Sequence, residues 1–377
     1  MQILPLLLLA ISPIQIDGLL GDWADGVTLQ EDAQFVYKRI DLPSELCLQQ
    51  LPEQKVVQIG EYEIYFSPDG KGYGVSCKKG SKWISPYEAG VVFAPTTAAT
   101  SFELRVNKAT GTYPFSFEKQ GDLRVVSWNV QFGALLKDKA RGGRILKALQ
   151  PDVLLIQELD GEDTCSELES FLHDTLGGSW LVETNNSIGE KRSERLKSAI
   201  ATSADSMACF TVGKTPLKAI GASISFSNKP INFISLHLRC CGGPTSDAEK
   251  QRVSEATDIR KTIDSMQSPR FVIAGDWNLV GTTAPLHTVT KNDFAVVQAY
   301  QPDGRVHATW SDETSSFTPG RLDLMLYSPL SLEVARSFVL DTSDLDSDTL
   351  IAQELLGEDT ALLSDHLPLV ADFRVLK

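Results

Sequence analysis

The chain has 377 residues, of which 42% are hydrophobic and 22% are charged, as in an ordinary globular protein. Its length exceeds one typical domain of roughly 100 to 200 residues, so we expect two domains. The formal net charge of −14 at pH 7 argues against a broad basic face that holds nucleic acid, because such a face neutralises many phosphates with Lys and Arg. A bound metal ion could supply the missing positive charge.

The N-terminal sequence MQILPLLLLAIS contains a short apolar run, which is far below the ~20 residues that span a bilayer. A run of this length is typical of a secretory signal peptide, so we predict a signal peptide over residues 1–13 and a secreted or periplasmic protein. The stretch has no Lys or Arg and no clear cleavage motif follows it. A buried first strand is therefore the alternative. The sequence predicts no transmembrane segment.

The six cysteines fit an exported protein moderately well. Cys47 and Cys77 allow a disulfide bridge, and buried free thiols are an equally good interpretation because free Cys behaves as a small apolar residue. The adjacent Cys240 and Cys241 cannot easily serve one tetrahedral zinc ion.

Residues 14–107 read as short strands separated by turns, namely AQFVYKRI, KVVQIGEYEIYF, GYGVSC, GVVFA and SFELRV, with SPDGKG as a hairpin turn. This pattern predicts a small all-β sandwich. The edges IDGLLGDWADG and TSFELRV resemble sugar-binding-module-like β-sandwiches that bacteria append to secreted proteins. That resemblance implies a carbohydrate-binding surface, in which Trp23 and Trp83 would stack on a sugar, whereas a Trp in a small sandwich is more often part of the core.

Residues 108–120 are rich in turn formers and read as a linker. From 121 to 377, strands such as LRVVSWNV and VLLIQEL alternate with helices such as ARGGRILKALQ and TCSELESFLHDTLGG. A long helix is predicted from about Ser246, with an apolar stripe at helical spacing. Strands interleaved with helices indicate a layered α/β domain.

Several predicted strands of this domain have a polar residue at one end. These residues are Asn129 after LRVVSW, Glu158 after VLLIQ, His237 after INFISL, Asp276 and Asn278 around FVIAG, Asp323 before LML, and Asp365 with His366 before LPLV. Any one of them alone reads as a turn former. Together, at one edge of a layered sheet, they predict a cluster of carboxylates, amides and imidazoles. Clustered carboxylates repel one another unless a cation lies among them, and oxygen ligands suit Mg²⁺, Mn²⁺ or Ca²⁺.

The ordered motifs SWNV, QEL, SLHL, GDWN, RLDLML and SDHLP resemble those of the endonuclease/exonuclease/phosphatase superfamily, which includes deoxyribonuclease I, neutral sphingomyelinases, inositol polyphosphate phosphatases and deadenylases. The resemblance covers residues 121–377 and implies a four-layer α/β sandwich with two central, mostly antiparallel sheets. It also implies phosphoester hydrolysis by in-line attack of water, with Mg²⁺ as the cofactor.

The resemblance assigns roles to the strand-end residues. Glu158 would be the main metal ligand, and Asn129 and Asp365 would complete the metal site. Asp276 and Asn278 would position the attacking water and the scissile phosphate, with His237 as a further phosphate contact. Asp323 would orient His366, which we expect to act as general acid/base with Asp276 sharing the role.

The sequence departs from the family pattern in one respect, because residues 159–236 contain no Tyr that could contact the phosphate. Arg195 is a substitute for that contact, and an ordinary surface Arg is an equally good interpretation. The segment CCGGPTSDAEKQR reads as a flexible, substrate-selective loop. The acidic run 341–354 fails as a calcium-binding loop, because Thr349 replaces the required Gly and Leu355 the required Glu.

Three functions are therefore considered. The leading hypothesis is a secreted Mg²⁺-dependent nuclease or phosphodiesterase whose substrate is nucleic acid. The alternative is a phosphatase or sphingomyelinase-like hydrolase of a small or lipid phosphoester, which the net acidity and the missing Tyr favour. A catalytically inactive binding protein is the third, and the sequence leaves the oligomeric state open.

Overall fold

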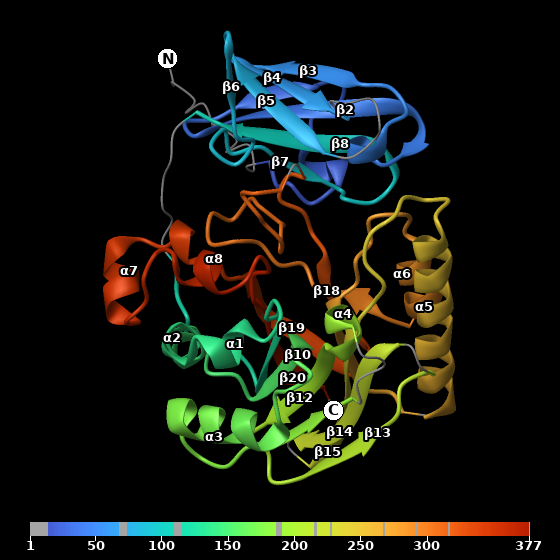
Figure 1. Cartoon of the computed structure of the whole chain (residues 1–377), viewed down its shortest axis with the longest axis vertical. Helices are drawn as coiled ribbons and strands as arrows, with labels where there is room; N and C mark the ends of the chain where they lie inside the picture. The colour runs from blue at the N-terminus through green and yellow to red at the C-terminus, as the bar shows by residue number, and fades with distance from the viewer. Residues whose placement is uncertain are drawn as a thin grey trace, which may run out of the picture.

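The computed structural model describes residues 14–67, 74–108, 115–185, 191–214, 217–226, 228–266, 268–291, 293–315 and 317–376. The predicted signal peptide, most of the SPDGKG turn and part of the predicted linker lie outside these ranges. An all-β part precedes a larger α/β part, and the two lie against each other along the long axis of the molecule (Figure 1).

The first part is a sandwich of two sheets, each with four strands within the described residues. One sheet has the order β1 (Leu29–Glu31), β2 (Phe35–Leu46), β8 (Ala99–Asn107), β7 (Val92–Ala94), and the other β3 (Lys55–Ile59), β4 (Tyr62–Phe66), β5 (Val75–Lys79), β6 (Lys82–Ile84). Alternate residues of both sheets, such as Ile40 and Ile64, form a common core. Short 3₁₀ turns lie at η1 (Leu20–Asp22) and η2 (Leu48–Gln50).

The second part contains two central sheets of six described strands each. One has the order β11 (Leu181–Thr184), β12 (Lys197–Thr202), β10 (Val153–Leu159), β9 (Leu123–Asn129), β20 (Leu369–Val375), β19 (Leu332–Val339). The other has the order β13 (Met207–Phe210), β14 (Lys218–Phe226), β15 (Lys229–His237), β16 (Phe271–Asp276), β18 (Asp323–Tyr327), β17 (Ala295–Val296). Only the pairs β9/β10 and β15/β16 are parallel among these described strands.

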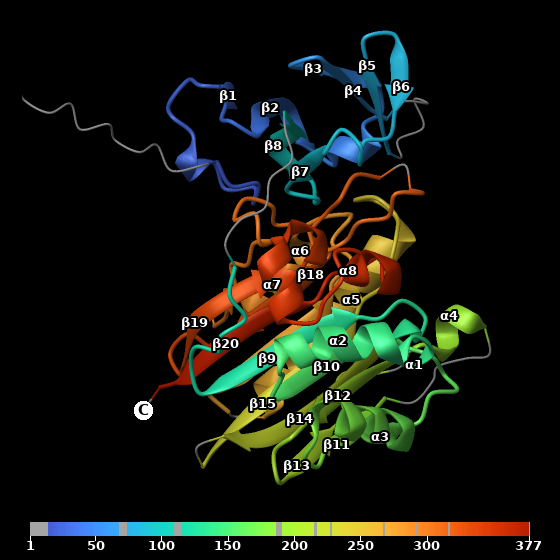
Figure 2. The ribbon, with the colours of Figure 1, turned by 90° about the vertical axis from the view of Figure 1, so that its left-hand side faces the viewer.

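Helices cover the outer face of each sheet (Figures 1 and 2). The elements on the side of the β9 sheet are α1 (Ala134–Lys137), α2 (Lys139–Leu149), α3 (Cys165–Leu176), η3 (Thr342–Asp344), α7 (Ser347–Ala352) and α8 (Asp359–Leu363), and those on the side of the β16 sheet are α5 (Asp247–Ser265) and α6 (Ala284–Thr290). The short helix α4 (Arg192–Arg195) precedes β12. In β9, Val125 faces the core between the sheets and Val126 the core under the helices. The predicted four-layer sandwich with a preceding all-β sandwich is therefore confirmed.

The helix ends follow from local sequence. Thr164 caps α3 through a reciprocal capping box with Glu167. Helix α2 ends at Leu149, and its C-cap Gln150 directly precedes Pro151. The predicted long helix is α5, capped by Ser246. None of the helices in the described ranges is long and apolar enough to cross a membrane.

The two parts share a hydrophobic cluster. Ile14 and Ile16, together with aromatic residues of the β-sandwich, pack with Val306 and Ala308 of the second part. Arg105 of β8 forms an ion pair of 2.5 Å with the buried Asp303. The sandwich is thus fixed to the α/β part by apolar and charged contacts, and the linker boundary at 108–120 stays a prediction.

The two tryptophans of the sandwich have different surroundings. Trp23 is buried in the shared cluster and donates a hydrogen bond of 2.8 Å from Nε1 to Glu103 Oε1, so the core interpretation is correct for it. Trp83 is 57% exposed and packs against Tyr65 with ring centroids 5.0 Å apart. A sugar-binding role of Trp83 stays a prediction.

The cysteines of the described residues are free thiols, so the Cys47–Cys77 bridge is wrong. The physical reason is their surroundings. Cys77 lies in the sandwich core, whereas the Cys47 thiol points toward the second part and lies 3.2 Å from the carbonyl oxygens of Val280 and Gly281.

A buried ion pair ties two central strands together and yields a stability prediction. Arg124 of β9 donates to both carboxylate oxygens of Asp372 of β20, at 2.6 and 2.8 Å, and to the carbonyl oxygens of Phe117 and Leu149. Arg124→Met leaves Asp372 buried without its partner, and we expect a loss of about 3–5 kcal/mol in the free energy of unfolding, measured in urea.

The matched control is Arg374→Met in β20, the strand of Asp372, which removes an exposed pair with Glu333 and should cost little. The double variant Arg124→Met/Asp372→Leu should recover part of the loss, because it leaves no buried charge uncompensated. Equal stability of Arg124→Met and the wild type would contradict the structural role of this pair.

Candidate active site

The register of three neighbouring strands brings polar side chains into one row. His237 at the end of β15 pairs with Asp276 at the end of β16, and Asp276 pairs with Asp323 at the start of β18. Gly275 makes the close approach possible: its φ is +148°, and a Cβ there would lie 1.9 Å from the carbonyl oxygen of Leu236. The GDWN motif thus needs its Gly to hold Asp276 next to His237.

His366 and Asp323 form a buried dyad. Nδ1 of His366 lies 2.7 Å from Oδ2 of Asp323, and the backbone of His366 accepts a hydrogen bond of 3.0 Å from Trp128 Nε1. Burial by itself lowers the pKa of His366, but the negative charges of Asp323 and Asp276 and the hydrogen bond to Asp323 raise it to about 10. The imidazole is therefore held protonated, with Nε2 directed toward Asp276.

Asp276 lies at the centre of the cluster. Its Oδ2 accepts a hydrogen bond of 3.2 Å from Asn129 Nδ2 and lies 3.6 Å from His237 Nε2 and 3.7 Å from His366 Nε2. Burial raises the pKa of Asp276 to about 8, and the neighbouring carboxylates of Asp323 and Glu158 act in the same direction. A carboxyl group in this state can hold or release a proton near neutral pH.

Glu158 reaches the cluster from the other sheet through an irregularity at the end of β10. Its φ is +60°, and the pairing of β10 with β12 shifts register between Ile156 and Leu159. A bulge of this kind re-aims a side chain at the edge of a sheet. Oε2 accepts a hydrogen bond of 3.1 Å from the Phe132 backbone amide, and Oε1 lies 3.8 Å from His237 Nε2.

His237 lies between the carboxylates of Glu158 and Asp276. Burial, together with the positive charges of Lys218 and His366, lowers its pKa well below the usual range, so the ring is neutral. Its Nδ1 is buried and has no hydrogen-bond partner among the described residues. A neutral imidazole with one unpartnered nitrogen is able to contact a bound group.

Asn278 completes the arrangement beside Asp276. Its backbone amide donates to Asp276 Oδ1 at 3.0 Å in a local turn, which requires its positive φ of 48°, and its Nδ2 donates to the carbonyl oxygen of Leu238. The structure thus brings seven of the nine predicted residues together: Asn129, Glu158, His237, Asp276, Asn278, Asp323 and His366.

The two other predicted residues have hydrogen-bond or ion-pair partners outside this set. Asp365 follows a bend that directs its side chain toward Trp310, whose Nε1 donates to Asp365 Oδ2 at 2.9 Å. Arg195 is at the end of α4, where its guanidinium pairs with Glu162 Oε1 at 3.2 Å, and it does not line the cavity at the site. Asp365 is still close enough to His366 for its negative charge to raise the pKa of that imidazole. The metal role of Asp365 and the phosphate contact of Arg195 therefore stay predictions.

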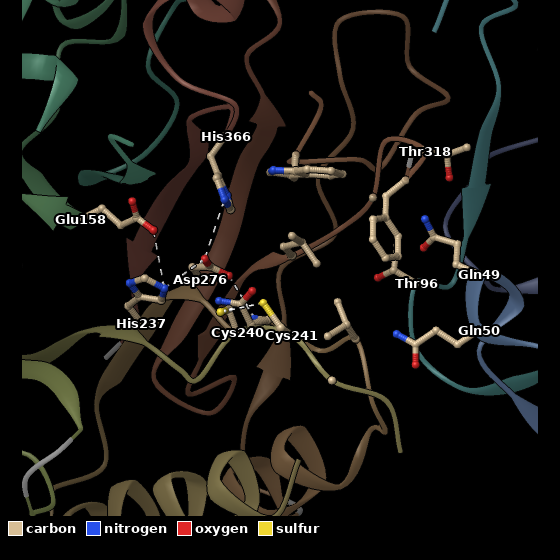
Figure 3. A pocket seen from close by; sticks show the side chains of 17 residues that line it. Gln49, Gln50, Thr96, Glu158, His237, Cys240, Cys241, Asp276, Thr318 and His366 are labelled. Carbon is tan, nitrogen blue, oxygen red and sulfur yellow. Dashed lines mark hydrogen bonds and ion pairs between the residues drawn. The ribbon is translucent and has the colours of Figure 1, made fainter. Parts of the chain in front are cut away.

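A cavity of about 350 Å³ opens over the cluster (Figure 3). Glu158, His237, Asp276, Asn278 and His366 form one side of it. The other sides are formed by residues that the sequence analysis did not single out, namely Gln49, Gln50, Thr96, Val280, Trp310, Phe317, Thr318 and Leu322. No local signal in the sequence connects residues 49–96 or residues 310–322 with the site.

The predicted loop at CCGG is held in place rather than loosely attached. Arg252 of α5 is fully buried, and its guanidinium donates to the carbonyl oxygens of Arg239, Cys241 and Gly242. This cation is in turn paired with Glu249. Cys240 and Cys241 therefore line the cavity at a fixed position, and the role of this loop in selecting substrates stays a prediction.

The donor set at the site fits a divalent cation. Asp276, Asp323 and His366 place one ligand atom each within 4.8 Å of one another, and Glu158 adds a further carboxylate beside His237. A protonated His366 has no lone pair for a metal ion, so the carboxylate oxygens are the available ligands. Asp323 Oδ1 is buried without a partner among the described residues. Crowded carboxylates suit a hard, oxygen-preferring ion.

Acid, amide and imidazole side chains cluster at one edge of two layered sheets and face a cavity. This arrangement is typical of a hydrolytic site. The family model "Endonuclease/Exonuclease/phosphatase family" matches residues 126–366. This match covers more than half of the chain, so the chain belongs to that family, whose members act on phosphoesters.

Similar folds occur among solved structures. An endonuclease/exonuclease/phosphatase from Bacteroides vulgatus has 18% identity and a TM-score of 0.49, and covers 68% of this chain and 100% of its own. The catalytic domain of human Nocturnin with bound sulfate has 21% identity and a TM-score of 0.48, and covers 69% and 97%. A 3′ phosphatase from Neisseria bound to a product DNA hairpin has 17% identity and a TM-score of 0.47, and covers 67% and 99%. No curated protein sequence gave a significant match.

The position of Glu158 leads to a prediction on metal binding. Glu158→Gln replaces a charged oxygen ligand by a neutral one while keeping the shape of the side chain, so we expect Mn²⁺ affinity to fall roughly tenfold or more. Isothermal titration of the purified protein with Mn²⁺ measures this directly, without a substrate. Glu162→Gln, the same change at the exposed residue that pairs with Arg195, is the control and should bind Mn²⁺ like the wild type. Equal affinities for all three proteins would exclude Glu158 as a ligand.

Proposed function

We propose that the chain is a divalent-metal-dependent phosphoester hydrolase in which His366, Asp323 and Asp276 carry the proton transfers. The observation that supports this most is the buried dyad of His366 and Asp323 beside Asp276, on the wall of a cavity that also contains Glu158. A structural histidine would need only one partner. Three carboxylates around two imidazoles, open to a cavity, are arranged for chemistry.

The geometry suggests which residue carries out each step of the proposed hydrolysis. Asp323 holds Nδ1 of His366, so that Nε2 carries the proton that faces the cavity and can be given to a leaving oxygen. Asp276, with its raised pKa, is suited to accept a proton from water. A divalent cation held by Glu158 would supply positive charge to the phosphate oxygens. Asn129 donates to Asp276 and fixes its orientation, and Asn278 and His237 remain the proposed phosphate contacts.

The substrate is proposed to be a small phosphoester rather than a long nucleic acid. The described residues that line the cavity include no Lys or Arg, and the net charge of the chain is −14. A long polyanion would find little to neutralise its phosphates at the described surface of this cavity. A nuclease that acts on a polymer, and Mg²⁺ as the natural metal, stay hypotheses. The apolar N-terminal run supports the further proposal of an exported protein.

The decisive test is hydrolysis of bis(p-nitrophenyl) phosphate by the purified chain. We expect release of p-nitrophenol with Mg²⁺ or Mn²⁺, loss of activity with excess chelator, and recovery when the metal is returned. Plasmid DNA, RNA and phosphate monoesters in parallel reactions separate the substrate classes. Full activity in excess chelator would overturn metal dependence, and no activity on any of these substrates would favour the binding-protein alternative.

The dyad predicts non-additive kinetics. His366→Ala and Asp323→Ala should each lower kcat roughly 10²-fold or more, because each removes the positioned proton donor. The double variant should fall little further, since the two residues act as a unit. Circular dichroism of all three variants checks that they are folded. Losses that multiply in the double variant would show that the residues act separately, leaving Asp276 as the acid/base candidate.

The charge of Asp323 also predicts a shift in the pH profile. Asp323 raises the pKa of His366, so Asp323→Asn should lower it. If protonated His366 is the active form, activity falls as pH rises through its pKa, and the alkaline limb of kcat should move to lower pH in the variant. Asn has the same size as Asp but no charge, so a shift of the alkaline limb reports the loss of the negative charge at position 323. An unmoved limb would exclude His366 as the group that titrates there.

A further inference from the structure

The wall of the cavity opposite the catalytic cluster belongs to the β-sandwich. Gln49 and Gln50 of η2 and Thr96, which follows β7, line the cavity on the side away from His366 and Asp276 (Figure 3). The α/β part adds Thr318 to the same side (Figure 3). A molecule that fills this space would touch both parts of the chain.

Hydrogen bonds fix this wall to the α/β part. The Cys47 thiol lies 3.2 Å from the carbonyl oxygens of Val280 and Gly281, directly before η2. Thr96 Oγ1 donates to the carbonyl oxygen of Arg321 at 3.1 Å, and the Ala98 amide donates to Gly281 at 3.3 Å. The relative position of Gln49 and the catalytic cluster is therefore set by several independent contacts.

Two buried polar atoms on this wall have no protein partner. Nε2 of Gln49 and Oγ1 of Thr318 make no hydrogen bond with any described residue, although the residues are only 8% and 2% exposed. Buried polar groups are almost always paired, and leaving one unpaired destabilises a protein. Both residues line the cavity, and the Gln49 amide is directed toward it (Figure 3). A ligand in the cavity would satisfy them.

The space between this wall and the catalytic cluster is apolar. It is bounded by Val280, Trp310, Phe317 and Leu322. Trp310 has its indole N–H bound to Asp365, so its contribution to the cavity is the ring. An apolar trough that has a phosphoester site at one end and a buried amide donor at the other suits a flat organic ring with a hydrogen-bond acceptor.

We propose that Gln49 and Thr318 form a subsite that binds the base of a nucleoside phosphate whose phosphoryl group lies at Asp276 and His366. The proposal rests on the proposed function of that cluster. A cavity of about 350 Å³ has the size for one nucleotide-like molecule. Inositol polyphosphates would need basic residues, which the lining lacks, and a lipid chain has no acceptor for the Gln49 amide. A base stacks on aromatic rings and offers carbonyl or ring-nitrogen acceptors.

The test compares probes that share sugar and phosphate. Isothermal titration of the full chain, in the His366→Ala background so that the probes stay intact, measures the affinities of the four ribonucleoside 5′-monophosphates and of ribose 5-phosphate. We expect at least one nucleotide to bind roughly tenfold tighter than ribose 5-phosphate. Gln49→Met and Thr318→Val should each reduce that preference about five- to tenfold, because each removes a hydrogen-bonding group, and leave ribose 5-phosphate affinity unchanged.

Gln58→Met is the matched control, since Gln58 is exposed on β3 of the same sandwich and does not line the cavity. It should keep the full preference. Thermal unfolding checks the fold: Gln49→Met replaces an unpartnered buried amide by an apolar chain of similar length, so its melting temperature should not fall below that of its His366→Ala parent.

Two outcomes would overturn the subsite. One is that no nucleotide binds tighter than ribose 5-phosphate, including the case in which a long-chain lipid phosphate binds best. The other is that the preference survives both Gln49→Met and Thr318→Val. The proposed function is judged separately by metal-dependent hydrolysis of bis(p-nitrophenyl) phosphate. A protein that keeps the base preference but hydrolyses nothing would retain the subsite and refute the hydrolase.

Discussion

The site depends on one constraint of strand register. His237, Asp276 and Asp323 occupy neighbouring positions across β15, β16 and β18, so a slip of one residue in any pair would turn a carboxylate or imidazole to the opposite face of the sheet. The constraint explains why Gly275 is needed, since a side chain there would collide with the β15 backbone. It also explains the crowding of charge, because the register brings two acids together in a buried place. The raised pKa of Asp276 thus follows from the strand pairing that buries it beside Asp323.

The two sheets contribute differently to this cluster. The β16 sheet supplies its residues at regular register positions, whereas the β9 sheet sends Glu158 in through a local departure from regular pairing and a left-handed backbone. Regular strands set distances that are hard to vary, and a bulge allows one side chain to be aimed independently. The combination holds His237, Asp276 and Asp323 at fixed register positions while Glu158 is aimed separately.

Much of the fold and of the cluster could be predicted from the sequence, because strand hydrophobicity and the polar residues at strand ends are local patterns. Asn129, Glu158, His237, Asp276, Asn278, Asp323 and His366 were found in this way. The hydrogen bond from Trp310 to Asp365 could not be predicted, because a motif gives the order of residues but not the direction of each side chain. Gln49 and Thr96 could not be found, since their approach to the site results from docking of two parts of the chain over long sequence separation. The Cys47–Cys77 bridge failed for the same reason, as the partner of Cys47 lies beyond residue 279.

The shared cluster of Ile14, Ile16, Val306 and Ala308 has a consequence for how the molecule behaves as a whole. An isolated sandwich or an isolated α/β part would expose half of this cluster to water, so the interface contributes to the stability of both. Because both parts also line the cavity, substitutions in the first residues of the sandwich would weaken the contact that holds the two walls of the cavity together.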